Sequence, residues 1–114
     1  MTVETLLKHI YDAFNKRDIE TVLAALHPEV NWPNSWEGGR LHGIEAVRDY
    51  WTRQWAAIDP NIVPLAFKRE PDGRVTVQVR AVVRDRAGHL LAEHTLEHIY
   101  TFEDDLVSHM EVRE

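Results

Sequence analysis

The residues best suited to chemistry lie between positions 93 and 102, where two kinds of side chain alternate. Alternation with a period of two predicts a β-strand. One face of this strand would carry two imidazoles and a phenol among apolar side chains: His94, Leu96, His98, Tyr100 and Phe102. Because this face is the more aromatic of the two, we expect it to point into the protein.

A shared metal ion is the first chemistry to test for the two histidines. His94 and His98 have the spacing of two zinc ligands on a helix. On a strand, however, the rise is about 3.3 Å per residue, so residues four apart are separated by roughly 13 Å. Zinc–nitrogen bonds are only about 2 Å long. The two side chains therefore cannot bind one ion, and we expect neither a metal nor a cofactor.

Proton transfer or hydrogen-bond donation is the chemistry that His98 and Tyr100 suit better. A histidine in a partly apolar pocket has a pKa near neutrality or below, which suits a general acid or base. A histidine that only lines the pocket, or is hydrogen-bonded in the core, is an equally good interpretation. We take His98 as the candidate acid/base or oxyanion donor, with Tyr100 in support.

Tryptophans and a tyrosine gather around one loop in the middle of the chain. Aromatic residues at helical spacing usually fill a core, but tryptophan and tyrosine also carry polar groups that need partners when buried. Their concentration beside a loop with glycines indicates that this loop borders a cavity. We expect a small apolar or aromatic ligand to contact these residues: Trp32, Asn34, Trp36, Trp51, Trp55, His94 and Met110.

Three helices are expected in the first half of the chain. Apolar residues recur at helical spacing in the ranges 3–14, 19–26 and 44–58. Thr2 and Asp18 precede the first two ranges and are good N-caps, because their side-chain oxygens can accept from free amides of the first turn.

The segment between the second and third helices is predicted as a short strand and a loop. Pro28 would end the second helix, because the residue before a proline is disfavoured in the helical region. Residues 30–32 alternate as a strand does, and residues 33–43 contain several chain breakers. Pro60 would end the third helix.

Antiparallel strands are expected to fill the second half. The ranges are 61–68, 74–84, 90–102 and 106–113, and Asp72-Gly73 is a strong hairpin signal between the first two. Helices followed by antiparallel strands are typical of an α+β fold. The length and the lack of an internal repeat predict one domain over residues 1–114.

The turn before the last strand decides which of its residues face inward, because a shift of one residue exchanges the two faces. A three-residue turn at 103–105 would place Met110 opposite His98. A two-residue turn at 104–105 would place Glu111 there and create an acid/base pair. We favour the three-residue turn because it buries the apolar residues of the strand: Leu106, Met110 and Val112.

Three segments carry a family resemblance. DIETVLAALHPEVNWPN stands at 18–34, LHGIEAVRDYWTRQW at 41–55 and FEDDLV at 102–107. Together they resemble the NTF2-like superfamily, in particular the SnoaL-like proteins and the ketosteroid isomerases. The resemblance implies a cystatin-like cone, in which three N-terminal helices pack on a curved antiparallel β-sheet and enclose a pocket. This fold specifies no single activity.

The resemblance to the ketosteroid isomerases also shows departures. Their general base is a carboxylate, and Asn34 stands at the matching position. Their helix tyrosine falls on Ile10, with Tyr11 one residue away and on another part of the helix. His98 matches the acid that stabilises the oxyanion in those enzymes. Steroid isomerisation is therefore not expected, and Glu37 is the nearest alternative carboxylate.

Two functional hypotheses follow. In the first, the protein is a cofactor-independent SnoaL-like isomerase or cyclase that acts on an apolar oxygenated substrate through His98 and Tyr100. In the second, it is a non-catalytic module of the same fold that binds a ligand or forms a dimer. The absence of a base at Asn34 favours the second hypothesis, and the inward histidines favour the first.

Composition narrows the range of partners. The chain has 114 residues, a formal net charge of -6 and no basic stripe, which argues against a nucleic-acid partner. It has no cysteine, no visible signal peptide and no long apolar run, so we expect a cytoplasmic protein that does not bind membranes. A homodimer is expected through the outer sheet face, which carries Thr76, Gln78, Arg80, Val82 and Arg84.

Overall fold

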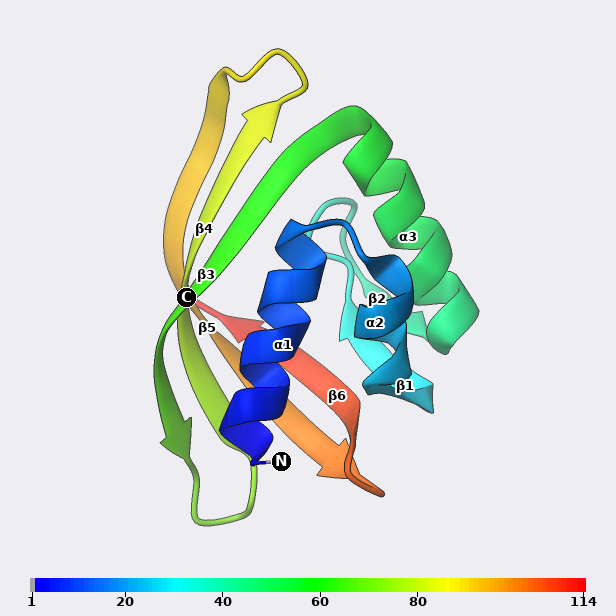
Figure 1. The fold of residues 1–114 in the computed structure, drawn as a ribbon, viewed down its shortest axis with the longest axis vertical. Coiled ribbons are helices and arrows are strands. Elements are labelled where there is room, and N and C mark those ends of the chain that lie inside the picture. Colours follow the sequence, from blue (N-terminus) through cyan, green and yellow to red (C-terminus); the bar gives the residue numbers. More distant parts are fainter. Residues whose placement is uncertain (1) are drawn as a thin grey trace.

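Three helices and one curved sheet form the part of the chain that the structure, a computed structural model, describes, residues 2–114 (Figure 1). The helices are α1 (Val3–Asn15), α2 (Ile19–Ala24) and α3 (Ile44–Ala57). The strands are β1 (Leu26–Pro33), β2 (Arg40–His42), β3 (Ile58–Arg69), β4 (Val75–Asp85), β5 (Leu90–Glu103) and β6 (Leu106–Arg113). No helix of these residues is long and apolar enough to cross a bilayer.

The predicted α+β cone is confirmed, with one correction to the sheet. The strand order is β2-β1-β6-β5-β4-β3, and the sheet curves around α1 while α3 runs along its open side (Figure 1). Pairing is antiparallel except between β1 and β6, which are parallel. The sheet is therefore mixed rather than purely antiparallel, since β1 and β6 run in the same direction.

The helix starts follow the predicted caps, but two helices end earlier than predicted. Thr2 Oγ1 accepts from the Thr5 N–H at 3.1 Å, and an Asp18 carboxylate oxygen accepts from the Thr21 N–H. The second helix ends at Ala24 and β1 begins at Leu26. The two prolines expected to stop helices lie inside strands.

Both prolines occupy positions at which a strand tolerates a missing N–H. Pro28 lies in the interval of β1 where the register to β6 is interrupted, between Leu26 and Asn31. Pro60 lies in β3, which is an edge strand of the sheet. Proline is accommodated at such irregularities and edges because no ladder hydrogen bond is lost.

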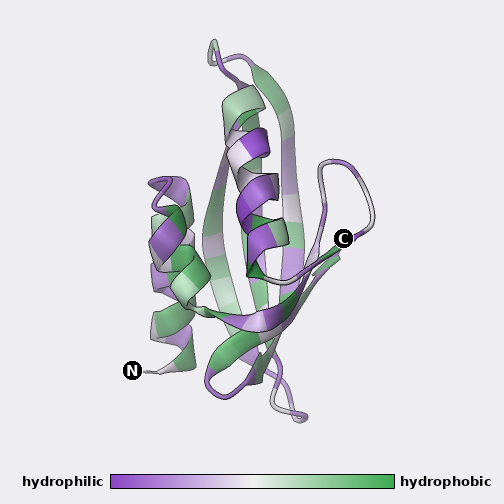
Figure 2. Cartoon of the chain, turned by 90° about the vertical axis from the view of Figure 1, so that its right-hand side faces the viewer, coloured by the Kyte–Doolittle hydropathy of each residue, from purple (hydrophilic) through white to green (hydrophobic). Residues whose placement is uncertain are grey.

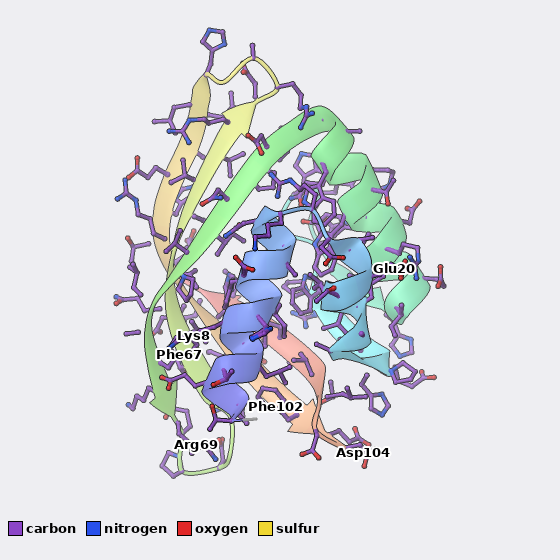
Figure 3. All side chains as sticks on the ribbon, in the orientation of Figure 1. Lys8, Glu20, Phe67, Arg69, Phe102 and Asp104 are labelled. Atoms are coloured by element: carbon purple, nitrogen blue, oxygen red, sulfur yellow. The ribbon has the colours of Figure 1, made fainter. Side chains whose placement is uncertain are left out.

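The sheet and helices meet through one apolar interior. In β4, Val75, Val77, Val79 and Ala81 are buried, whereas Gln78 and Arg80 are exposed, as the alternation predicts. Thr76 of the predicted outer face is instead buried, and its hydroxyl donates to Glu70 Oε1 at 2.9 Å. Polar positions cover the outer side of α3 (Figure 2). At the rim, Lys8 Nζ of α1 lies 5.5 Å from the ring centroid of Phe67 of β3 (Figure 3).

The predicted three-residue turn between β5 and β6 is wrong. Glu103 pairs with Leu106, so only Asp104 and Asp105 form the turn. Both have positive φ, 55° and 63°, a combination that suits the tight twist of a two-residue hairpin.

A bulge in β6 then turns Met110 and Val112 inward, as predicted, although the predicted turn length was wrong. Thr101 pairs with His109 but Phe102 pairs with Val107, so Ser108 is the extra residue. Tyr100 therefore lies opposite Met110, and His98 lies opposite Val112. Val107 is fully buried where Leu106 was expected, and exposed Glu111 lies opposite Ile99, so no His98–Glu111 pair forms.

The β5–β6 turn generates a stability prediction. Replacing Asp105 by glycine should raise the free energy of unfolding by about 0.5–1 kcal/mol, because glycine adopts positive φ without a Cβ clash. Urea denaturation followed by circular dichroism measures the change. Asp105→Ala is the matched control, since it removes the same charge but keeps Cβ. An equal gain in the alanine variant would show that charge, not backbone conformation, limits stability.

Candidate functional site

A cavity of about 370 Å³ opens between the concave face of the sheet and helices α1 and α3. Its wall is mostly aliphatic and aromatic, and every helix and five of the strands contribute to it. The lining residues are Ile10, Tyr11, Phe14, Val22, Trp32, Pro33, Ser35, Trp36, Tyr50, Trp51, Gln54, Ile58, Pro60, Ile62, Ala81, Val83, Ala92, His94, Leu96, His98, Tyr100, Met110, Val112 and Glu114.

A chain of hydrogen bonds joins α1 to β5 in the wall of this cavity. The Tyr100 hydroxyl donates to the Tyr11 hydroxyl at 2.7 Å. The Tyr11 oxygen lies 2.8 Å from Nδ1 of His98. The Tyr11 oxygen accepts from Tyr100, and we assign its own proton to Nδ1 of His98, the other polar atom within hydrogen-bond distance. His98 then carries its proton on Nε2, which has no hydrogen-bond partner among residues 2–114.

Burial determines the charge state of all three groups. It lowers the pKa of His98 from 6.5 to about 4, so the imidazole is neutral near pH 7. Burial likewise raises the pKa of Tyr11 and of Tyr100, and both phenols keep their protons. The three hydrogen-bonded side chains are therefore uncharged, and the imidazole of His98 offers one N–H donor.

Stacked and edge-to-face rings form the wall beside this chain. Trp32 and Trp51 meet edge to face with ring centroids 5.4 Å apart, and Trp32 also lies 6.4 Å from Tyr100. Trp51 stacks on Trp55 at 5.9 Å. Such offset and perpendicular arrangements are the favourable geometries for aromatic pairs. They produce an aromatic wall in which Trp32 contacts both Trp51 and Tyr100.

The structure brings most of the predicted site residues together. Seven of them line the one cavity: Trp32, Trp36, Trp51, His94, His98, Tyr100 and Met110. His94 is exposed, whereas His98 is only 5% exposed. Asn34 and Trp55 do not line the cavity. Trp55 lies behind Trp51, with Arg17 over its ring at 5.3 Å.

Asn34 organises the loop that carries Trp36. Its amide donates to Glu37 Oε1 at 3.0 Å, and its carbonyl oxygen accepts from the Glu37 N–H at 2.8 Å. Arg53 of α3 donates to the other Glu37 oxygen at 2.6 Å. The hydrogen bonds from Arg53 and Asn34 hold the pKa of Glu37 below its usual value. This carboxylate is therefore committed to the loop and is no base for the cavity.

Three buried residues with polar groups line the cavity but were not predicted as site residues. Tyr11 was set aside because the family pattern placed the helix tyrosine at Ile10; both side chains line the cavity. Tyr50 and Gln54 stand in the buried stripe of α3 and face the cavity from its helical wall. The signal for all three was a polar group at a buried position of an amphipathic helix.

One cluster of possible metal ligands lies outside the cavity. His27, Glu103 and Asp104 each offer a ligand atom, and Asp104 stands at the tip of the β5–β6 turn (Figure 3). However, Nδ1 of His27 accepts from the Glu29 N–H at 3.0 Å. Neutral His27 therefore carries its proton on Nε2, the atom that faces Asp104. This hydrogen bond opposes metal binding at Nε2.

Comparison with known families agrees with this architecture. Residues 7–110 match the SnoaL-like domain. The chain belongs to the SnoaL-like domain family. No curated protein sequence matches it significantly.

Solved structures share the fold along nearly the whole chain. An NTF2-like protein of unknown function from Burkholderia pseudomallei is 26% identical, with 96% of this chain and 88% of that chain covered and a TM-score of 0.83. TerC, crystallised with polyporic acid, is 24% identical, with 95% and 87% covered and a TM-score of 0.81. A Mycobacterium tuberculosis protein in complex with estradiol-17β-hemisuccinate is 15% identical, with 95% and 89% covered and a TM-score of 0.82.

The buried imidazole predicts a specific pH dependence of stability. The pKa of His98 is lower in the folded state than in the unfolded state, so between pH 6.5 and about 4 the unfolded chain binds the extra proton. Stability should therefore fall as the pH drops through this window, by up to about 1.4 kcal/mol per pH unit from this group. Urea denaturation of wild type and His98→Gln at several pH values isolates the contribution, because the other titrating groups are shared. Parallel pH profiles for the two proteins would contradict it.

Proposed function

We propose that the protein binds a neutral, apolar small molecule that bears an oxygen acceptor, and that His98 Nε2 donates to that oxygen. The observation that carries the proposal is the chain from Tyr100 through Tyr11 to His98. In the assignment made above, the imidazole proton lies on Nε2, and the hydrogen bond to Tyr11 holds the ring in place. His98 lines the cavity, and its Nε2 has no partner among residues 2–114, so a ligand oxygen in the cavity would give this donor a hydrogen bond.

The shape and composition of the cavity support the same class of ligand. Its volume of about 370 Å³ suits a small organic molecule. No lysine or arginine stands among its described lining residues, which favours a neutral ligand. Two proteins of the same fold were crystallised with polyporic acid and with estradiol-17β-hemisuccinate, which supports small-molecule binding by this chain as well.

As an enzyme, the protein would use His98 to stabilise an oxyanion. Its imidazole is neutral near pH 7, so it acts as a hydrogen-bond donor rather than as a charged acid. A neutral imidazole can polarise a carbonyl and stabilise the enolate that forms from it. This is the chemistry of a cofactor-independent isomerase or cyclase, in which Tyr11 and Tyr100 position the donor.

Binding without catalysis is the second candidate function. Among the described residues that line the cavity, the one carboxylate side chain is that of Glu114. It is exposed at the rim, whereas the donor chain is buried. An enolisation needs a base near the carbon that loses its proton, and the inner wall supplies no carboxylate for this step.

The outer face of the sheet and the cellular location stay predictions from the sequence. The outer face carries ion pairs between Arg80 and Glu93 and between Arg113 and Glu97. Pairing of two copies through this face, and a cytoplasmic location, are proposed together with the binding function on the sequence pattern alone.

Binding of two matched probes tests the role of His98. Fluorenone and fluorene differ by one carbonyl oxygen, and isothermal titration calorimetry compares their affinities. Wild type should prefer fluorenone by about three- to tenfold, as one hydrogen bond of about 0.5–1.5 kcal/mol allows. The preference should vanish in His98→Leu, in which apolar contacts remain.

His89→Leu is the matched control, because His89 is exposed in the β4–β5 turn and lies outside the cavity. It should keep the wild-type preference. Equal affinity of wild type for both probes, or a preference that survives in His98→Leu, would overturn the proposal.

A further inference from the structure

We infer that Gln54 is a second polar anchor of the cavity, and that it accepts a hydrogen bond from a hydroxyl group of the ligand. The ligand would then be a neutral hydroxy-ketone or related molecule, with an acceptor oxygen at one end and a hydroxyl donor at the other. This inference rests on the proposed function and specifies its ligand class.

Gln54 occupies a core position of α3 that an apolar residue would ordinarily fill. It is 9% exposed and lines the cavity, and its neighbours in the buried stripe of the helix are Val47, Tyr50 and Trp51. A buried amide is unfavourable unless its polar atoms find partners. The partners of this side chain therefore indicate what the position requires.

The amide nitrogen of Gln54 has a protein partner. Nε2 donates to the hydroxyl oxygen of Tyr50, one helical turn earlier, at 3.2 Å. The backbone N–H groups of Ser35 and Trp36 face the same Tyr50 oxygen and partly offset the rise in its pKa that burial causes. These contacts hold Tyr50, and Tyr50 in turn orients the amide.

The amide oxygen of Gln54 has no hydrogen-bond partner among residues 2–114, and it is not among the fully buried polar atoms that lack one. It is therefore accessible from a cavity that the side chain lines. An amide oxygen accepts and cannot donate. A hydroxyl or N–H of a bound molecule is the group that fits it.

The two anchors lie on different walls of the same cavity. His98 is on β5 and is held by Tyr11 of α1, whereas Gln54 is on α3, along the open side of the sheet (Figure 1). The wall between them is aromatic, with Trp32 and Trp51 in contact. Because both anchors line one cavity of about 370 Å³, a single small molecule is expected to contact both.

The polar groups of the cavity differ in what they select. His98 offers a donor and so selects an acceptor oxygen. Gln54 offers an acceptor and so selects a donor. Since the cavity lining described here includes no lysine or arginine, a ligand carboxylate would find no cation. The combination favours a neutral ligand that has both a carbonyl and a hydroxyl group.

Calorimetry with fluorenone and its 2-, 3- and 4-hydroxy isomers tests the inference. The best hydroxy isomer should bind wild type about fivefold or more tightly than fluorenone. Gln54→Met, which has a similar shape and no amide, should bind that isomer and fluorenone equally. Gln54→Glu keeps an acceptor oxygen and should retain the preference for the hydroxy isomer, so the test does not depend on one variant.

Two controls separate this inference from the proposed function. Gln78→Met makes the same substitution on the exposed outer face of β4 and should change nothing. His98→Leu should lose the preference for fluorenone over fluorene but keep the preference for the hydroxy isomer.

The outcomes are distinct. If no hydroxy isomer binds wild type more tightly than fluorenone, or if the preference survives in Gln54→Met, the inference is wrong while the role of His98 stands. If wild type binds fluorenone and fluorene equally, the proposed function fails. Loss of the preference in Gln54→Met together with its retention in Gln54→Glu supports the anchor.

Discussion

The site depends on one constraint: a buried imidazole must be kept neutral and hydrogen-bonded inside an apolar cone. Tyr11 meets this constraint because its hydroxyl can accept from Tyr100 and donate to His98 at the same time. The chain also ties α1 to β5, and so holds the first helix against the concave side of the sheet. The hydrogen bonds that join α1 to β5 therefore also orient the imidazole of His98.

The inward placement of the last strand depends on two local features that compensate for each other. The two-residue turn at Asp104 and Asp105 alone would have turned Met110 outward, and the bulge at Ser108 reverses this. Alternation along β5, together with the aromatic side chains of one face, predicted that His98 and Tyr100 point inward. It did not predict the turn, since two aspartates with positive φ carry no glycine signal.

Side chains that face a cavity from a helix were harder to predict than those on a strand. A strand has only two faces, so alternation placed His98 and Tyr100 on the same face, and the aromatic side chains of that face indicated that it points inward. A helix distributes its residues around a circle, and the family pattern pointed to Ile10 rather than to Tyr11, although both line the cavity. Gln54 lies in the buried stripe, but its orientation depends on Tyr50, which the sequence does not show.

The loop after β1 explains why the inner wall of the cavity offers hydrogen-bonding groups but no free carboxylate. Asn34 directs both ends of its amide to Glu37, and Arg53 binds the remaining carboxylate oxygen of that residue. The polar capacity of this loop is used to hold Trp36 at the cavity, so no acid on the loop is available as a base. The cavity is left with a neutral donor on the sheet and a neutral acceptor on α3. In the proposed function such a pair binds a ligand through its oxygens, and any proton that leaves carbon would be taken by a group at the rim or by the ligand itself.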